Sequence, residues 1–201
     1  MLNFKHHERT PALGLQHRSR RSARGRAGFT LIDVMMAAVV LAIAISGMSG
    51  AILVGMSLNR VNHDTALAQQ AARRVIEEIE SRAFSETFAA YNANVGDDGG
   101  LTSAAVGANF AVAGLEPMTG DADGMCGRVM FPTQTVGAVE QLREDVVDAA
   151  LGMPRDLNGD GLVDALDHAA NFRLLPVRVR IEWKGSVGPR TIDIETMLSA
   201  R

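Results

Sequence analysis

The sequence Arg24-Gly-Arg-Ala-Gly-Phe-Thr-Leu-Ile-Asp-Val34 decides how the chain is organised, because a long uncharged stretch follows it directly. The 25 residues from Val34 to Leu58 carry no charged side chain. About 20 apolar residues in a helix span the hydrocarbon core of a bilayer, so this stretch is long enough to cross a membrane. A buried helix of a soluble protein usually keeps a polar face, which this stretch lacks. We therefore expect a membrane-spanning helix here.

The net charge of −3 hides an uneven distribution of charge along the chain. Residues 1–28 carry seven basic side chains and one acidic one, a net charge of +6, whereas residues 29–201 carry 13 basic and 22 acidic ones, a net charge of −9. A basic flank beside a membrane span stays in the cytoplasm, so we expect the acidic remainder outside the inner membrane. A basic arm could instead bind nucleic acid. The apolar stretch directly after it favours the membrane, and we expect no nucleic-acid partner.

A small residue, Gly28, and a large apolar one, Phe29, lie between the basic segment and the apolar stretch. Ordinary secretory signals are cut after their apolar core. A cut between Gly28 and Phe29 comes before the core and would leave it in the mature protein. The run Gly-Phe-Thr-Leu-Ile-Asp-Val resembles the prepilin processing site of type IV pilins and type II secretion pseudopilins, which usually have Glu where this chain has Asp33.

This resemblance implies insertion into the inner membrane, cleavage by the prepilin peptidase and N-methylation of Phe29. It also implies incorporation into a filament through the N-terminal helix, with other pilins or pseudopilins and the assembly platform as partners. A lone charge at bilayer depth costs at least about 2.5–3.5 kcal/mol, so Asp33 needs a partner. By the resemblance, Asp33 would neutralise the new amino group of Phe29 on a neighbouring subunit. The alternative is that Asp33 stays hydrated near the membrane interface.

The sequence predicts three regions: a basic leader over residues 1–28, the transmembrane half of a long helix over residues 29–58, and a globular domain over residues 59–201. We expect the helix to run from Phe29 to about Glu86. Its second half carries apolar residues at three- and four-residue spacing, which favours packing of one face. These residues are Ala68, Ala72, Val75, Ile76, Ile79 and Ala83.

Strand patterns follow the helix and are clearest at the end of the chain. Apolar and charged residues alternate over 177–184 and again over 192–198. A Gly-rich loop separates the two runs, which predicts a hairpin. Arg178 and Arg180 are then expected to pair with Glu195 and Asp193 across the strands. Residues 110–115 and 128–131 are further strand candidates, and residues 139–151 are expected to be helical. We thus expect an α+β, pilin-like fold with one long N-terminal helix packed on a small antiparallel sheet.

The second motif is Asp156-Leu-Asn-Gly-Asp-Gly-Leu-Val-Asp-Ala-Leu-Asp167, which matches the EF-hand pattern Asp-x-Asn-x-Asp-Gly. Calcium takes six to eight oxygen ligands, and Gly161 permits the sharp turn at the sixth position. We expect helices on both sides of the loop and a structural Ca²⁺ within it. The alternative is a solvated turn. The predicted ligands are Asp156, Asn158, Asp160, the Leu162 carbonyl, Asp164 and Asp167.

An Asp at the twelfth position makes this loop similar to those of dockerin modules. Dockerins carry two such loops, so the single loop in this chain does not imply binding to cohesin, their usual partner. Wider similarity, in the strand candidates and the closing hairpin, is to minor pilins of the type IV pilus modification class. A type II secretion minor pseudopilin shares the same processing and is equally compatible with the motif.

Two different classes of protein would also fit this sequence: a membrane-anchored calcium-binding or adhesive module that never polymerises, and an anchored enzyme. The chain has no phosphate-binding Gly motif and no zinc-ligand spacing, so we expect no enzymatic activity. His63 and His168 are expected at the surface. The single cysteine, Cys126, cannot form an intrachain disulfide.

Overall fold

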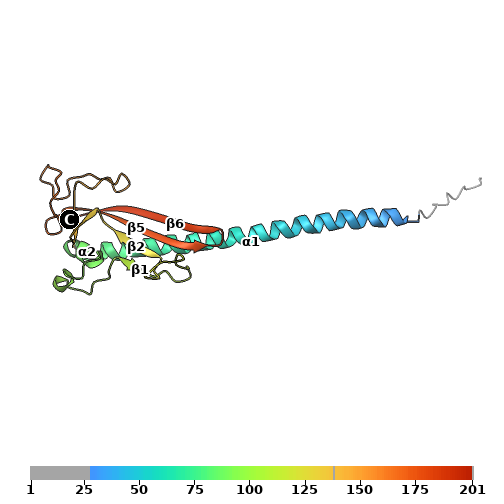
Figure 1. The fold of residues 1–201 in the computed structure, drawn as a ribbon, viewed down its shortest axis with the longest axis horizontal. Helices are drawn as coiled ribbons and strands as arrows, with labels where there is room; N and C mark the ends of the chain where they lie inside the picture. Colours follow the sequence, from blue (N-terminus) through green and yellow to red (C-terminus); the bar gives the residue numbers. More distant parts are fainter. Residues whose placement is uncertain (1–27, 138, 201) are drawn as a thin grey trace, which may run out of the picture. The chain divides into compact units, whose positions relative to one another are not determined.

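The computed structural model describes residues 28–137 and 139–200, so the predicted leader lies outside the described residues except for Gly28. The chain divides into two units, Met1–Met48 and Ser49–Arg201, and the boundary between them lies inside the first helix. Figure 1 shows the fold and labels α1, α2, β1, β2, β5 and β6. The elements are α1 (Leu31–Ser81), α2 (Phe84–Tyr91), the short 3₁₀ helix η1 (Asp98–Gly100), β1 (Asn109–Phe110), β2 (Gly127–Met130), β3 (Thr133–Val136), β4 (Val139–Leu142), β5 (Leu174–Gly185) and β6 (Gly188–Ser199).

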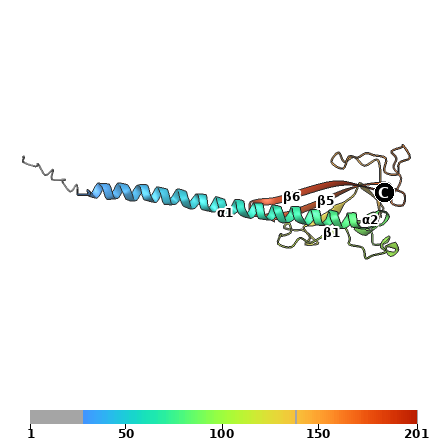
Figure 2. The same cartoon turned by 180° about the vertical axis from the view of Figure 1, so that it is seen from behind.

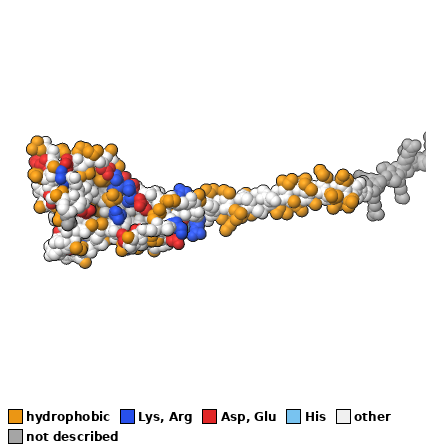
Figure 3. Space-filling model, viewed as in Figure 1, with side chains coloured by type: hydrophobic (Ala, Val, Ile, Leu, Met, Phe, Trp, Pro, Cys, Tyr) orange, Lys and Arg blue, Asp and Glu red, His pale blue; other side chains and the backbone are white. Residues whose placement is uncertain are grey.

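The first part of α1 is apolar and exposed, as the sequence predicts. Its large apolar side chains from Leu31 to Leu58 are between 52% and 80% exposed. Figure 3 shows hydrophobic side chains along this part of the helix. Among the described residues, α1 is the one helix long and apolar enough to span a membrane. An N-terminal membrane-anchoring helix is therefore consistent with the structure.

The second part of α1 packs against the sheet. Ala68 and Ala72 are fully buried and Ile79 is 1% exposed. They belong to one core cluster with Val177 and Val179 of β5. Figures 1 and 2 show α1 running beside β5, β6 and β2 from both sides of the molecule. Val75 and Ile76 pack against the same cluster, which confirms the predicted apolar face except at Ala83, which lies beyond α1 and is exposed.

The predicted continuous helix to Glu86 is wrong, because α1 ends at Ser81. Ala83 has an extended backbone (φ −61°, ψ 125°), and α2 begins at Phe84. The break turns the chain so that Phe88 and Tyr91 enter the core, where they are 2% and 1% exposed. Tertiary burial of two aromatic side chains outweighs the local preference of the sequence for a straight helix.

The main sheet is antiparallel with the strand order β1-β2-β5-β6. The long β5–β6 hairpin confirms the predicted closing hairpin, with Arg178 opposite Glu195 and Arg180 opposite Asp193. Arg180 donates two hydrogen bonds of 2.8 Å to Asp193. Residues 128–131 largely form β2 as predicted. Residues 110–115 do not form the predicted strand, because β1 stops at Phe110 and the N–H of Leu115 closes a turn onto the Val112 carbonyl (3.2 Å).

The predicted helix over residues 139–151 is also wrong. Residues 139–142 are β4, which pairs with β3 in a separate two-stranded sheet. Beyond Leu142 the Asp148 carboxylate accepts the N–H groups of Ala150 and Leu151 (3.1 and 3.2 Å). Such side-chain hydrogen bonds offer the backbone an alternative to a helix. The α+β class is nonetheless confirmed, with one long N-terminal helix and a small antiparallel sheet.

Candidate functional site

Backbone hydrogen bonds fix both ends of the segment 156–167 to the rest of the domain. The Leu157 carbonyl accepts the N–H groups of Arg173 and Leu174 (2.7 and 2.9 Å) at the start of β5. The N–H of His168 donates to the Leu142 carbonyl (2.8 Å) at the end of β4. Leu157 itself is fully buried. The loop is therefore positioned by strands on both sides and not by the flanking helices that the sequence predicts, since no residue from 143 to 173 is helical.

The start of the loop turns around the carboxylate of Asp156. Its two oxygens accept the N–H groups of Gly159 (2.5 Å) and Gly161 (2.7 Å). Gly161 has a φ of +88°, a conformation that L side chains rarely adopt, as the predicted turn requires. The hydrogen bonds from Gly161 and Gly159 hold the pKa of Asp156 below its ordinary value. The carboxylate of Asp156 therefore lies at the centre of the turn.

Asn158 and Asp160 lie on the same turn as Asp156. The side-chain amide of Asn158 donates to Asp160 Oδ2 (3.0 Å), and Asp160 Oδ1 accepts the N–H of Leu162 (2.8 Å). The Leu162 side chain is 66% exposed. Asp156, Asn158 and Asp160 therefore lie on one turn, with their side chains hydrogen-bonded to neighbouring groups of the loop. Among the described residues, the acidic and histidine side chains that converge include only Asp164 of the predicted ligands.

The end of the loop is arranged differently. Asp167 Oδ1 accepts the N–H groups of Leu142 and Ala169 (both 3.1 Å), so this oxygen is directed to the end of β4. Asp164 Oδ1 accepts the N–H of Leu166 (2.8 Å) and lies 3.1 Å from Nε2 of His168. The pKa of Asp164 is lowered, first by the Leu166 N–H and then by His168.

A residue that sequence analysis missed, Glu144, lies beneath the loop. It is fully buried. Its Oε1 accepts the N–H groups of Leu157 (2.6 Å) and Asn158 (3.2 Å), and its Oε2 accepts the N–H of Asp164 (3.3 Å). One buried carboxylate therefore links the beginning of the loop to its ninth position. No spacing rule connects Glu144 to a loop that begins 12 residues later, so the sequence offers no cue for it.

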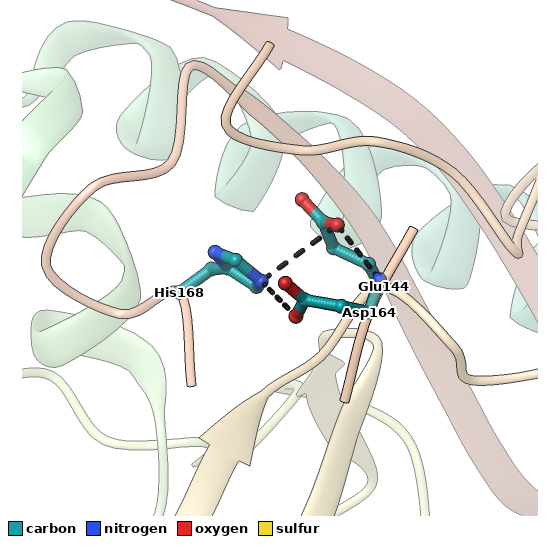
Figure 4. A group of neighbouring side chains, drawn as sticks. All are labelled: Glu144, Asp164 and His168. Atoms are coloured by element: carbon teal, nitrogen blue, oxygen red, sulfur yellow. Dashed lines mark hydrogen bonds and ion pairs between the residues drawn. The ribbon is translucent and has the colours of Figure 1, made fainter. Parts of the chain in front are cut away.

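Glu144, Asp164 and His168 converge, and Figure 4 shows their side chains pointing toward one another. One ligand atom from each residue lies within 4.8 Å of the other two, so this largely buried group could hold a metal ion. His168 is 2% exposed, which contradicts its predicted surface position, whereas His63 is exposed as expected. Burial alone would lower the pKa of His168. Hydrogen bonds to Asp164 and Asn171 and the charge of Glu144 outweigh burial, and the pKa is raised.

The predicted processing residues lie at the start of the described chain. Phe29 is 90% exposed. Asp33 Oδ2 accepts the backbone N–H of Thr30 (3.1 Å) and its hydroxyl (2.7 Å), and the N–H of Asp33 lies 3.4 Å from the Thr30 hydroxyl oxygen. This reciprocal arrangement is a capping box, which satisfies free N–H groups at a helix start. Asp33 thus has a local partner that sequence analysis did not predict.

Comparison of the chain with protein-family models, with curated proteins and with solved structures finds no match.

Proposed function

We propose that the chain is a minor pilin or pseudopilin, processed by the prepilin peptidase and assembled through its N-terminal helix into a type IV pilus. The observation that carries the proposal is the order of features at one point of the chain. The Gly28–Phe29 pair and the acidic Asp33 lie at the start of an apolar helix segment whose large side chains are all exposed. In the proposal those side chains face lipid before assembly and neighbouring subunits afterwards.

The proposed topology is a single pass through the inner membrane, with a cytoplasmic leader and a periplasmic domain that reaches the cell surface after assembly. The basic leader and the acidic remainder support this orientation. Partners would be the prepilin peptidase, other pilins and the assembly platform. The domain would act structurally and not as an enzyme.

We further propose that the loop 156–167 binds a structural Ca²⁺. The observation that favours it is the turn around Asp156, which places the hard oxygen groups of Asp156, Asn158 and Asp160 on one turn of the chain. Because the backbone of Leu157 hydrogen-bonds to the start of β5, an ion in the loop would stabilise the closing hairpin. The same loop on a membrane anchor also supports a second candidate function, a calcium-binding module that never polymerises.

The assembly proposal is tested by separating the charge of Asp33 from its capping role. Asp33→Asn keeps a side-chain oxygen for the Thr30 N–H and hydroxyl but removes the charge, whereas Asp33→Glu keeps the charge. We expect Asp33→Glu to enter sheared filament fractions as the wild type does and Asp33→Asn to be cleaved but remain in the membrane.

Asp64→Asn, a charge loss in the second part of α1, is the matched control and should assemble normally. If Asp33→Asn assembles as well as the wild type, the carboxylate serves only as a cap, and the proposed contact with a neighbouring amino group is wrong. If the wild type never leaves the membrane fraction of a piliated cell, the non-polymerising module is favoured instead.

A further inference from the structure

We propose that Glu144, Asp164 and His168 form a second metal site, beside the calcium loop, that takes a divalent transition metal such as Zn²⁺. The site shares only Asp164 with the predicted calcium ligands. It does not depend on assembly into a filament, and variants outside Asp164 separate it from the calcium proposal.

The chemical type of the donors selects the metal. Calcium is a hard cation that is bound by oxygen ligands. An imidazole nitrogen with two carboxylates suits zinc and the other late divalent metals of the first transition row. Glu144 Oε2 and Asp164 Oδ1 both face Nε2 of His168, so the nitrogen lies at the centre of the group.

The separations of the donor atoms fit a small ion. Nε2 of His168 lies 3.1 Å from Asp164 Oδ1 and 3.7 Å from Glu144 Oε2. Two ligands that each lie about 2.0–2.1 Å from a tetrahedral zinc are about 3.3 Å apart. The two observed distances lie on either side of this value, and all three donor atoms lie within 4.8 Å of one another. Three protein ligands leave the fourth position for water.

Neighbouring groups hold the donors in a ligating orientation. Nδ1 of His168 lies 3.1 Å from Asn171 Oδ1, which can accept its proton and leave Nε2 for a metal. Glu144 Oε1 is occupied by two backbone N–H groups, which directs Oε2 toward His168. The Glu144 and His168 side chains are 1% and 3% exposed, so the geometry is set by packing and not by solvent.

The test uses the full-length chain in detergent micelles with His6, His7, His17 and His63 changed to Gln, so that His168 is the only imidazole. Zn²⁺ binding is measured by competition with a chromophoric chelator, and Co²⁺ is used as a visible probe of coordination. We expect one equivalent of Zn²⁺ and the absorption bands of tetrahedral Co²⁺. Glu144→Gln and His168→Gln should each weaken Zn²⁺ binding at least tenfold.

Asp160→Asn is the matched control, because Asp160 belongs only to the calcium loop. It should weaken Ca²⁺ binding and leave Zn²⁺ affinity within about twofold. X-ray absorption of the zinc-loaded parent, in which Glu144, Asp164 and His168 are all unchanged, should show one imidazole nitrogen. Absence of that nitrogen, or equal loss of Zn²⁺ binding in Asp160→Asn and His168→Gln, would overturn the proposal while leaving the calcium proposal standing.

Discussion

The Glu144 carboxylate accepts three backbone hydrogen bonds from residues of the loop 156–167. It is fully buried, and a buried acceptor that loses its donors carries the full desolvation cost. Its contacts hold Leu157, Asn158 and Asp164 at fixed positions. These three hydrogen bonds define the backbone at the start of the loop and at its ninth position.

Replacing Glu144 tests this role directly. Glu144→Gln places an NH₂ group where one oxygen accepts a backbone N–H, so a buried donor meets a donor. We expect the free energy of unfolding, measured by denaturation in EDTA, to fall by about 1–3 kcal/mol. Glu80→Gln, an isosteric change at an exposed position of α1, should change it by less than about 0.5 kcal/mol. Equal stability of the two variants would contradict the structural role of Glu144.

The ion pair between Asp148 and Arg178 makes stability depend on pH. Arg178 is 8% exposed, and its Nη2 donates to Asp148 Oδ1 (2.8 Å). This hydrogen bond from Arg178 lowers the pKa of Asp148. A carboxyl with a lowered folded-state pKa stabilises the fold above its unfolded value of about 3.9, and this stabilisation is lost as pH falls through the folded-state pKa. We therefore expect the melting temperature to fall below about pH 4.

The variant Asp148→Asn isolates that contribution. At pH 7 it should lower the free energy of unfolding by about 1.5–3 kcal/mol, because a hydrogen bond to a charged partner is lost. Between pH 5 and pH 2 its melting temperature should fall less steeply than that of the wild type. A parallel fall in both proteins would show that other carboxylates account for acid sensitivity.

At the scale of elements, the contact between α1 and β5 depends on small side chains. Ala68 and Ala72 are fully buried one helical turn apart, opposite a strand of Val and Ile residues. Because protein interiors are closely packed, a larger side chain at these buried positions should displace neighbouring groups.

Enlarging one of these residues should separate the two elements. Ala72→Leu is expected to destabilise the domain by about 1–3 kcal/mol through overpacking. Ala66→Leu adds the same atoms at an exposed position of the same helix and should be nearly neutral. The measurement is chemical denaturation of both variants. A neutral Ala72→Leu would contradict the helix–sheet contact.

The loop 156–167 is the element on which calcium should act. With a Kd on the order of 10⁻⁴ M, 10 mM Ca²⁺ is a hundredfold excess and adds about 2.7 kcal/mol, or roughly 5–10 °C in melting temperature. Mg²⁺ at the same concentration should give a smaller shift. Asp160→Asn should abolish the Ca²⁺ shift, and Asp121→Asn, in another exposed loop, should keep it. No difference between Ca²⁺ and Mg²⁺ in the wild type would contradict the calcium proposal.

Sequence reasoning succeeded where a pattern depends on neighbouring residues. The alternation of Val179, Ile181 and Trp183 with charged residues predicts β5, and uncharged residues over a bilayer length predict the first part of α1. It failed where contacts with residues distant in the sequence determine the secondary structure. The 139–151 segment has helix-compatible residues, but pairing with β3 and the side chain of Asp148 determine its structure.

In the candidate site too, local patterns are predictable from the sequence and distant contacts are not. Asp156 and Gly161 lie in the predicted turn because the EF-hand spacing encodes a local conformation. Glu144 and His168 are brought together near the end of β4, and the sequence alone does not reveal which titratable side chains become buried. Their burial depends on backbone contacts such as His168 to Leu142.

At the scale of the whole chain, the first part of α1 is apolar and exposed, whereas the second part of α1 belongs to a folded domain with its own core. Such a chain combines a membrane-compatible segment with a domain that carries its own core. The proposed function requires that the bond before this helix is cut, so that the apolar half begins with a free amino group.

Whether that bond is cut can be read from the intact mass and N-terminal sequence of the membrane-extracted protein, expressed with and without a prepilin peptidase. We predict a chain that begins at Phe29 and carries one added methyl group when the peptidase is present, and a chain that begins at Met1 when it is absent. A chain that begins at Met1 under both conditions would contradict the assignment to the pilins.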